Sequence, residues 1–183
     1  MKTFIVLFNL VFLATGCLVK YGNMQSSSFV ATADSSYTNI SGRVELFFEG
    51  VIPEKEYEQI GYVEATGNSV SSNEEVLNFL RYEAYKNGAD AVINVKKQFK
   101  GREEGYLFDD ENVQYYDATV FGGTAIRYIE NTVLAEPVSE KDLNFVKYVE
   151  NVNSKNEKEV SNQVFISVFI GILSIIAVLI KNN

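Results

Sequence analysis

Two apolar segments at the ends of the chain limit what can fold between them. Residues 4–13 are apolar except for Asn9, and residues 164–180 are apolar except for two serines and one glycine. The 183-residue chain then has room in its middle for one ordinary domain, not for two. We therefore expect a single folded domain over residues 42–130, flanked by terminal segments of a different kind.

Cys17 closes the first apolar segment and is the only cysteine of the chain. After a positively charged start, residues 4–13 are too short to span a bilayer, and small residues fill positions 14–16. This pattern resembles a bacterial lipoprotein signal, with Ala14 where such signals usually have leucine. The resemblance implies that residues 1–16 are removed and that Cys17 carries the lipid. An ordinary signal peptide, or an uncleaved anchor that contains a cysteine, is the alternative.

Residues 17–41 have the composition of a tether. After Cys17 they are rich in small polar side chains and show no sustained period. Such a segment buries too little apolar area to offset the entropy that it loses on ordering. We therefore expect a lipidated cysteine followed by a flexible spacer that ends near residue 41.

The pattern of residues 42–130 predicts the element order β-β-α-β-β. A polar, charged connection is expected over residues 100–112, and Gly122-Gly123 is expected to form a bulge or bend. The natural architecture is α+β, with one helix packed on a face of a small, mostly antiparallel sheet. The expected strands are residues 43–48, 57–65, 89–99 and 113–129.

The helix between the second and third strands has clear signals at both ends. Ser71 with Glu74, and Ser72 with Glu75, form two overlapping capping boxes. Gly88 stands where a left-handed cap ends a helix. The expected apolar face consists of Val76, Leu77, Leu80 and Ala84.

A resemblance to a known family rests mainly on the segment after this helix, which is Gly88, Ala89, Asp90 and Ala91. Together with residues 57–63 and 123–126, it resembles the YbjQ-like family of small α/β domains, some of which are labelled heavy-metal-binding. The layout is also similar to that of the stress-sensing lipoproteins of the Rcs phosphorelay. The resemblance implies a small α/β fold over about residues 43–129. We interpret residues 88–91 as a fold signature, because the glycine caps the helix and the small residues clear it.

Two departures separate the chain from these families. The Rcs lipoprotein is disulfide-bonded, whereas this domain contains no cysteine. The heavy-metal label calls for cysteine or histidine ligands, and the chain has no histidine. The resemblance therefore supports a fold and gives no ligand.

The C-terminal part of the chain divides into a linker and an apolar segment. Residues 131–162 are rich in Asn, Glu and Lys, which predicts a polar, partly helical linker. Residues 163–180 would form a helix of roughly 27 Å, close to the hydrocarbon thickness of a bilayer. We expect a transmembrane helix there; a buried core helix is the alternative. Lys181 favours a cytoplasmic end, which places the domain on the extracytoplasmic side of the cytoplasmic membrane.

Charge and composition argue against two classes of function. The net charge is -8, so the protein has no electrostatic attraction for nucleic acid. The absence of histidine removes the side chain best suited to proton transfer near neutral pH. No P-loop, dinucleotide fingerprint or nucleophile–base pair is present. We expect neither an enzyme, nor a cofactor, nor a nucleic-acid partner.

Two clusters are candidates for binding. Asp109, Asp110 and Glu111, with Glu103 and Glu104, could hold Ca²⁺ through carboxylate oxygens. A solvated hairpin tip explains these residues equally well. An aromatic group could contact a partner or pack across strands within the sheet, the latter being favoured. Its members are Tyr106, Phe108, Tyr115 and Tyr116.

The sequence thus predicts a bacterial envelope lipoprotein whose domain is a non-enzymatic interaction or sensing module. Its partners would be membrane lipid and either another envelope protein or a second copy of the chain. The alternative is an extracytoplasmic domain that binds a ligand or an oxygen-liganded metal such as calcium.

Overall fold

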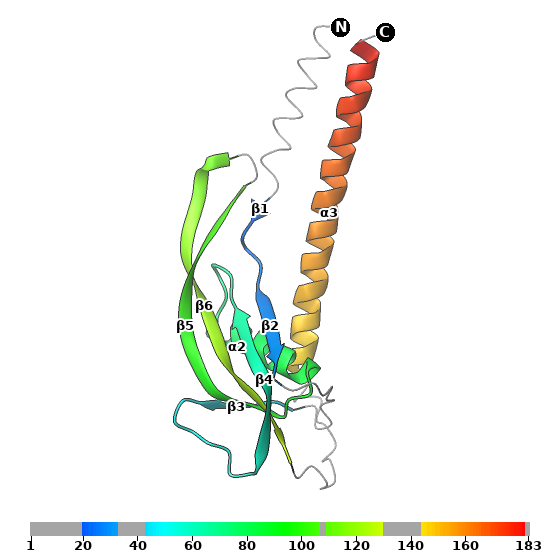
Figure 1. Cartoon of the computed structure of the whole chain (residues 1–183). Helices are drawn as coiled ribbons and strands as arrows, with labels where there is room; N and C mark the ends of the chain where they lie inside the picture. The colour runs from blue at the N-terminus through cyan, green and yellow to red at the C-terminus, as the bar shows by residue number, and fades with distance from the viewer. Residues whose placement is uncertain (1–19, 33–42, 107–108, 130–143, 182–183) are drawn as a thin grey trace. The chain divides into compact units, whose positions relative to one another are not determined.

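The computed structural model describes residues 20–32, 43–106, 109–129 and 144–181 (Figure 1). The chain divides into two compact units. The sheet unit consists of residues 23–102 and 115–151, and the terminal unit consists of residues 1–22, 103–114 and 152–183. In chain order the elements are β1 (Lys20–Tyr21), β2 (Ser26–Ala31), β3 (Glu45–Phe48), β4 (Tyr57–Thr66), α2 (Asn73–Lys86), β5 (Ala91–Tyr106), β6 (Asp109–Tyr128) and α3 (Asn144–Lys181).

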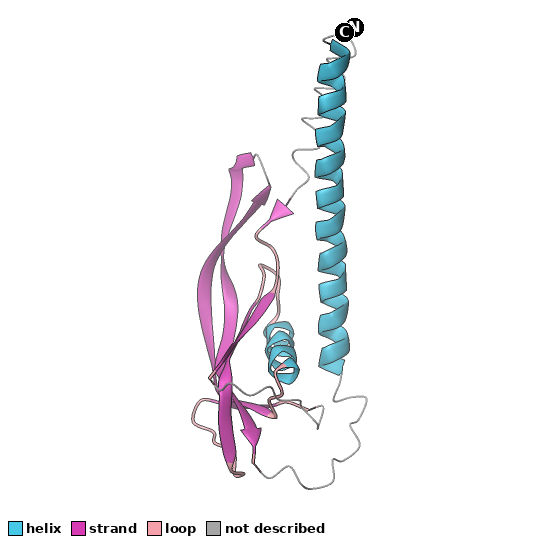
Figure 2. Ribbon diagram, turned by 45° about the vertical axis from the view of Figure 1, so that its right-hand side comes forward, coloured by secondary structure: helices cyan, strands magenta, loops and turns pink. Residues whose placement is uncertain are grey.

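The strands form one mixed sheet in the order β1-β5-β6-β4-β2, with β3 beside β5 off this path. The pairs β1–β5, β2–β4 and β4–β6 are antiparallel, whereas β3 runs parallel to β5. Figure 2 shows α2 beside the sheet, and α2 contacts β4 and β2. The α+β class and the β-β-α-β-β order from β3 to β6 are therefore confirmed.

The N-terminus of α2 is closed by a capping box. The Ser72 hydroxyl accepts a hydrogen bond from the Glu75 N–H at 3.2 Å, and the Glu75 carboxylate accepts one from the Ser72 N–H at 2.7 Å. Only the second of the two predicted boxes is present at the cap. Ser71 instead donates its hydroxyl hydrogen to the Asn68 side chain at 2.7 Å.

Gly88 caps the C-terminus of α2, as predicted. Gly88 has a φ of +78°, which glycine adopts without steric cost. The Gly88 N–H donates to the Tyr85 carbonyl and the Ala89 N–H donates to the Ala84 carbonyl, both at 3.0 Å. This pair of bonds is a Schellman motif, which satisfies two carbonyls at the helix end.

The core lies mainly between α2 and the sheet. The predicted apolar face of α2 included Leu77, which is half-buried; Phe79 is buried instead. A smaller cluster of buried residues surrounds Ile126 and includes Ala91, Ile93 and Tyr128, with Phe47 and Tyr57 packed against it. The buried residues of α2 are Val76, Phe79, Leu80 and Ala84.

The pairing of β6 with β4 shows no bulge at Gly122-Gly123, where a bulge or bend was predicted. Both glycines pair with β4 in continuous register, and the register shift between β4 and β6 lies between Gln59 and Gly61. Because these glycines have no side chain, atoms of the neighbouring strands can lie close to their backbone. A Cβ on Gly123 would lie 2.7 Å from the carbonyl oxygen of Ile93, so the neighbouring backbone occupies that space.

The irregularity of β5 lies at Asn94, which has a φ of +53°. Asparagine is among the few residues other than glycine that adopt this left-handed conformation readily. The pairing of β3 with β5 shifts register at the same place, between Leu46 and Phe48.

The flexible tether predicted for residues 18–41 is wrong for the part that the structure describes. In the terminal unit β1 pairs with β5, and in the sheet unit β2 pairs with β4 from Ser26 to Ala31. The composition argument failed because β2 buries little apolar area of its own. Its backbone is paired with β4 nonetheless, and the Ser27 hydroxyl donates to Glu83 on α2 at 2.9 Å.

The polar connection predicted for residues 100–112 is also wrong. β5 continues to Tyr106 and β6 begins at Asp109, so most of this range is strand. Because β5 and β6 are neighbours in the sheet, their backbone groups are paired even where polar side chains face water.

α3 covers residues 144–162 of the predicted linker and all of residues 163–180. The expectation of a partly helical linker is confirmed for the described residues. In that same part of the chain no helix is both long and apolar enough to cross a membrane, so the transmembrane helix expected at residues 163–180 is not found. The signal peptide, Cys17 and residues 131–143 lie outside the described residues.

Candidate functional site

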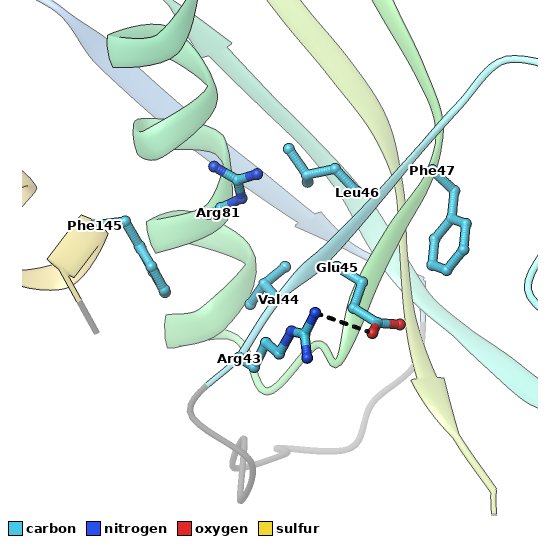
Figure 3. Close-up of a pocket in the computed structure, with 7 residues that line it drawn as sticks. All are labelled: Arg43, Val44, Glu45, Leu46, Phe47, Arg81 and Phe145. Carbon is cyan, nitrogen blue, oxygen red and sulfur yellow. Dashed lines mark ion pairs between the residues drawn. The ribbon is translucent and has the colours of Figure 1, made fainter. Parts of the chain in front are cut away.

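A groove of about 450 Å³ lies in the sheet unit between β3, α2 and the start of α3 (Figure 3). This volume falls in the range of pockets that hold small molecules or side chains, about 300–1,000 Å³. We call it the β3 groove. Its lining residues are Arg43, Val44, Glu45, Leu46, Phe47, Arg81 and Phe145.

Side chains along β3 alternate between the two sides of the strand. Figure 3 shows Val44 and Leu46 pointing toward α2, whereas Glu45 and Phe47 point the other way. Val44 is buried, and Phe47 packs against the small core around Ile126. β3 therefore presents an apolar side to α2, while Phe47 on its opposite side packs against the core and holds the strand in place.

One backbone edge of β3 faces away from the sheet. The Glu45 N–H donates to the Asp90 carbonyl at 3.1 Å, which directs the backbone groups of Glu45 toward β5. Because these groups alternate along a strand, the N–H and C=O of Leu46 point away from β5. Among the described strands, none pairs with β3 on that side. The β3 groove thus borders an unpaired strand edge.

Arg81 supplies a half-buried positive charge to the groove. Burial lowers the pKa of its guanidinium, and the charge of Glu74 partly opposes this effect. In the described part of the chain, its hydrogen-bond partner is the Asn78 side chain at 3.3 Å, and no carboxylate forms an ion pair with it. A guanidinium has five N–H donors, so most of its capacity for an anion is available.

Arg43 adds a second cation at the edge of the groove. Its side chain is 66% exposed and lies 3.9 Å from the Glu45 carboxylate (Figure 3). That carboxylate also accepts a hydrogen bond from the Tyr128 hydroxyl at 2.9 Å. Burial and the bond to Glu45 raise the pKa of Tyr128, so its hydroxyl stays protonated as the donor. Glu45 is thereby held toward the sheet, away from Arg81.

The start of α3 forms the third wall of the groove. Phe145 is buried and meets Tyr85 edge to face, with ring centroids 6.0 Å apart. The Tyr148 hydroxyl donates to the Glu75 carboxylate at 2.8 Å. Burial, together with this bond, raises the pKa of Tyr148 to about 12. These contacts hold the first turns of α3 against α2.

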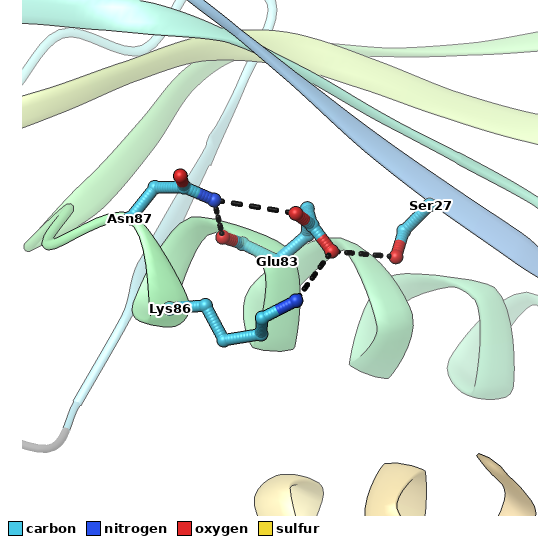
Figure 4. A network of polar contacts seen from close by, with 4 residues as sticks. All are labelled: Ser27, Glu83, Lys86 and Asn87. Carbon is cyan, nitrogen blue, oxygen red and sulfur yellow. Dashed lines mark hydrogen bonds and ion pairs between the residues drawn. The ribbon is translucent and has the colours of Figure 1, made fainter.

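A polar network joins β2 to the C-terminal half of α2 (Figure 4). The Glu83 carboxylate accepts from the Ser27 hydroxyl at 2.9 Å and lies 3.7 Å from the Lys86 ammonium. The Asn87 amide donates to the Glu83 carbonyl at 2.8 Å and to its carboxylate at 3.2 Å. Since every member has a partner within the network, we interpret it as a structural clamp.

The predicted fold signature is at the junction of three strands. Asp90 is 6% exposed, and its carboxylate accepts a hydrogen bond from the Tyr128 N–H at 3.0 Å. Its own N–H donates to the Ile126 carbonyl at 2.9 Å. Gly88 caps α2, and Ala89 and Ala91 are fully buried. These residues build the fold and line no part of the β3 groove.

The acidic cluster proposed for calcium is only partly described by the structure. Glu104 is buried, Glu103 and Glu111 are exposed, and the side chains of Asp109 and Asp110 lie outside the described residues. Among the described residues, no group of three or more acidic, cysteine or histidine side chains could hold a metal ion.

The aromatic group is only partly described. Tyr115 is 80% exposed and Tyr106 is 40% exposed, whereas Tyr116 is half-buried. Phe108 lies outside the described residues. The favoured interpretation, packing across strands, does not fit Tyr115, whose ring faces water.

Comparison of the chain with protein families, with curated proteins and with solved structures gives no match. The resemblance to YbjQ-like domains therefore stays a prediction from residues 57–63, 88–95 and 123–126.

The residues of the β3 groove were not predicted from the sequence. One signal was available: Arg81 lies four residues after Leu77 and three before Ala84, within the apolar stripe of α2. A charged residue in such a stripe points to a partly buried charge. Arg43 and Phe145 gave no comparable signal, because they reach the groove only through the pairing of β3 and the docking of α3.

Proposed function

We propose that this chain is a membrane-tethered, non-enzymatic binding module whose β3 groove receives a protein partner. The observation that carries the proposal is Arg81, a half-buried guanidinium that forms no ion pair with a carboxylate among the described residues. Leaving a partly desolvated charge unpaired costs stability, and such groups are kept where they bind something. Apolar walls from Leu46 and Phe145 suit a partner with both apolar and acidic groups.

The attachment to a membrane is proposed from the sequence. Cys17 follows a lipoprotein-like signal, and a diacylglyceryl group on it would give durable anchoring. The apolar run at residues 163–180 is the reason to propose a second contact with the lipid. The domain would then work at the extracytoplasmic surface of the cytoplasmic membrane, where another envelope protein or a second copy of the chain is within reach.

Photo-crosslinking in cells tests the binding function. A photoreactive amino acid placed at Leu46, inside the groove, is expected to capture a specific protein. The matched control is the same amino acid at Val70, which is 81% exposed and does not line the groove. Capture at both positions alike, or at neither, would reject the groove as the binding site.

The membrane attachment has its own test. The intact mass of the purified protein is expected to show loss of residues 1–16 and the added lipid. Cys17→Ser is expected to abolish that mass increase. Membrane fractionation of this variant, with and without residues 163–183, then shows whether the C-terminal segment holds the protein in the membrane without lipid.

A further inference from the structure

The free edge of β3 and the cation beside it lie in one groove, and together they define what kind of peptide can bind there. Leu46 directs its N–H and C=O away from β5, and no described strand pairs with β3 on that side. Such an edge can accept an extended peptide as an additional strand. The first requirement on the partner is therefore a segment that can adopt β conformation.

Charge adds a second requirement. Arg81 lines the groove on the α2 side with most of its donors free of described partners, and Arg43 stands at the groove edge. Among the described residues, Glu45 is the only acidic residue that lines the groove, and Tyr128 holds it on the opposite side of β3. A carboxylate that enters from the partner thus meets a guanidinium, which binds carboxylates with paired hydrogen bonds.

The apolar walls set the third requirement. In an extended peptide, alternate side chains point to the same side. The side chains two residues before and after a carboxylate that reaches Arg81 therefore enter the same groove, and its walls favour apolar side chains at these two positions. Leu46 and Phe145 are placed to contact them, since both line the same groove.

We infer that the β3 groove binds an extended protein segment by strand addition to β3, with an acidic side chain of that segment paired to Arg81 and flanked at alternate positions by apolar residues. This inference rests on the proposed function and specifies its partner. A small organic anion would bind Arg81 but leave the backbone groups of β3 unpaired. An extended peptide uses both features of the groove and is therefore the better match.

The binding test uses the full-length protein in detergent micelles and a fluorescein-labelled peptide, acetyl-Thr-Val-Thr-Glu-Thr-Val-Thr-amide, followed by fluorescence anisotropy. Its two valines and its glutamate lie on one side when it is extended. We expect saturable binding, weakened about tenfold or more when the glutamate is replaced by glutamine. Arg81→Gln in the protein should weaken binding to a similar extent. Lys97→Gln, a loss of charge on β5 outside the groove, should leave binding unchanged.

Two further measurements separate strand addition from binding of an anion. Replacing the glutamate by glutamine should have little further effect in Arg81→Gln, because the pair is already broken. Backbone N-methylation of the peptide should abolish binding, because it removes the peptide N–H groups that would donate hydrogen bonds to the carbonyl oxygens of β3. Circular dichroism of the variants shows whether they remain folded.

The results that overturn the inference are distinct from those that reject the proposed function. Undiminished binding of the N-methylated peptide, or full displacement by hexanoate, would exclude strand addition. Equal losses from the glutamine peptide in both proteins would exclude the pairing of the glutamate with Arg81. Capture of a partner at Leu46 in cells would still support the proposed function in that case. Absence of capture would reject the function itself.

Discussion

Asp90 joins three strands through its hydrogen bonds, and this structural role accounts for the sequence pattern around it. Its carboxylate binds the N–H at the end of β6, its N–H binds Ile126 in the same strand, and its carbonyl accepts from β3. An alanine before or after it leaves room for the strands to meet. The sequence pattern at residues 88–91 therefore follows from strand joining, which explains why these residues line no part of the β3 groove.

We expect Asp90→Ala to lower the free energy of unfolding by about 2–3 kcal/mol, because it leaves a buried N–H of Tyr128 without its acceptor. Asp90→Asn, which keeps an oxygen at that place, should cost less. Asp117→Ala, at an exposed position of β6, is the control and should change stability by less than about 0.5 kcal/mol. Urea unfolding followed by circular dichroism measures all three. Equal losses of unfolding free energy in Asp90→Ala and Asp117→Ala would show that the Asp90 carboxylate does not stabilise the junction of the strands.

Gly122 and Gly123 differ in what surrounds them, so their substitutions should differ in cost. A Cβ at position 123 would meet the backbone oxygen of Ile93 at 2.7 Å, which cannot move alone. At position 122 it would meet the hydroxyl end of Tyr62, a flexible and 43% exposed side chain. We expect Gly123→Ala to lower the unfolding free energy by about 1–3 kcal/mol and Gly122→Ala by less. Adding Tyr62→Phe should reduce the cost at position 122 only; the same relief at position 123 would contradict this explanation.

At the scale of elements, the sequence predicted those whose signals lie within the element itself. α2 was predicted with its capping box, apolar face and left-handed cap because these depend on neighbours within a few residues. β2 was missed because its stability depends on β4, whose paired residues lie 30 to 40 positions later in the chain. The β3 groove was missed for the same reason, since it needs β3, α2 and α3 to come together.

The link between α2 and α3 should depend on pH through Glu75. Hydrogen bonds from the Ser72 N–H and then from the Tyr148 hydroxyl lower the pKa of Glu75. A carboxyl whose pKa is lower in the folded state stabilises the fold above its unfolded pKa, and this contribution is lost as the pH falls through the folded pKa. Exposure to solvent keeps the contribution small.

We therefore expect Glu75→Gln to be less stable than the natural protein at pH 7, and the difference to shrink as the pH falls below about 4.3 and to vanish below the folded pKa of Glu75. Urea unfolding at a series of pH values measures this. Glu74→Gln, one residue earlier in the same turn, controls for the general effect of a charge at the helix N-terminus. Tyr148→Phe should weaken the pH dependence at Glu75 by removing one donor; a difference that persists unchanged at low pH would contradict this account.

At the scale of the whole molecule, β2 changes how the domain is connected to its proposed anchor. The sequence suggested a flexible spacer up to residue 41, but β2 begins nine residues after Cys17. A chain of that length spans at most about 30 Å. If Cys17 carries the lipid, the sheet unit is therefore held close to the membrane surface, where a groove partner would also have to lie.

β2 should consequently act as part of the sheet, and proline substitutions can show this. The Thr32 N–H donates to the Ile60 carbonyl at 3.0 Å, so by alternation the Ser28 N–H points to β4 and the Ala31 N–H points away. Ser28→Pro removes a hydrogen bond of the ladder and should lower the unfolding free energy by about 1–3 kcal/mol. Ala31→Pro removes none and should cost less than about 1 kcal/mol.

Ser28→Pro and Ala31→Pro should also differ in how strongly the protein self-associates in solution. When β2 is displaced, β4 becomes the edge of the sheet, and this edge carries the fully buried residues Val63 and Ala65 on either side of Glu64. Its backbone N–H and C=O groups then have no partner strand and can pair with another chain, so Ser28→Pro should self-associate more than Ala31→Pro in analytical ultracentrifugation at equal detergent concentration. If both variants keep the stability and association state of the natural protein, residues 26–31 are only a spacer. In that case the distance limit between Cys17 and the sheet unit no longer holds.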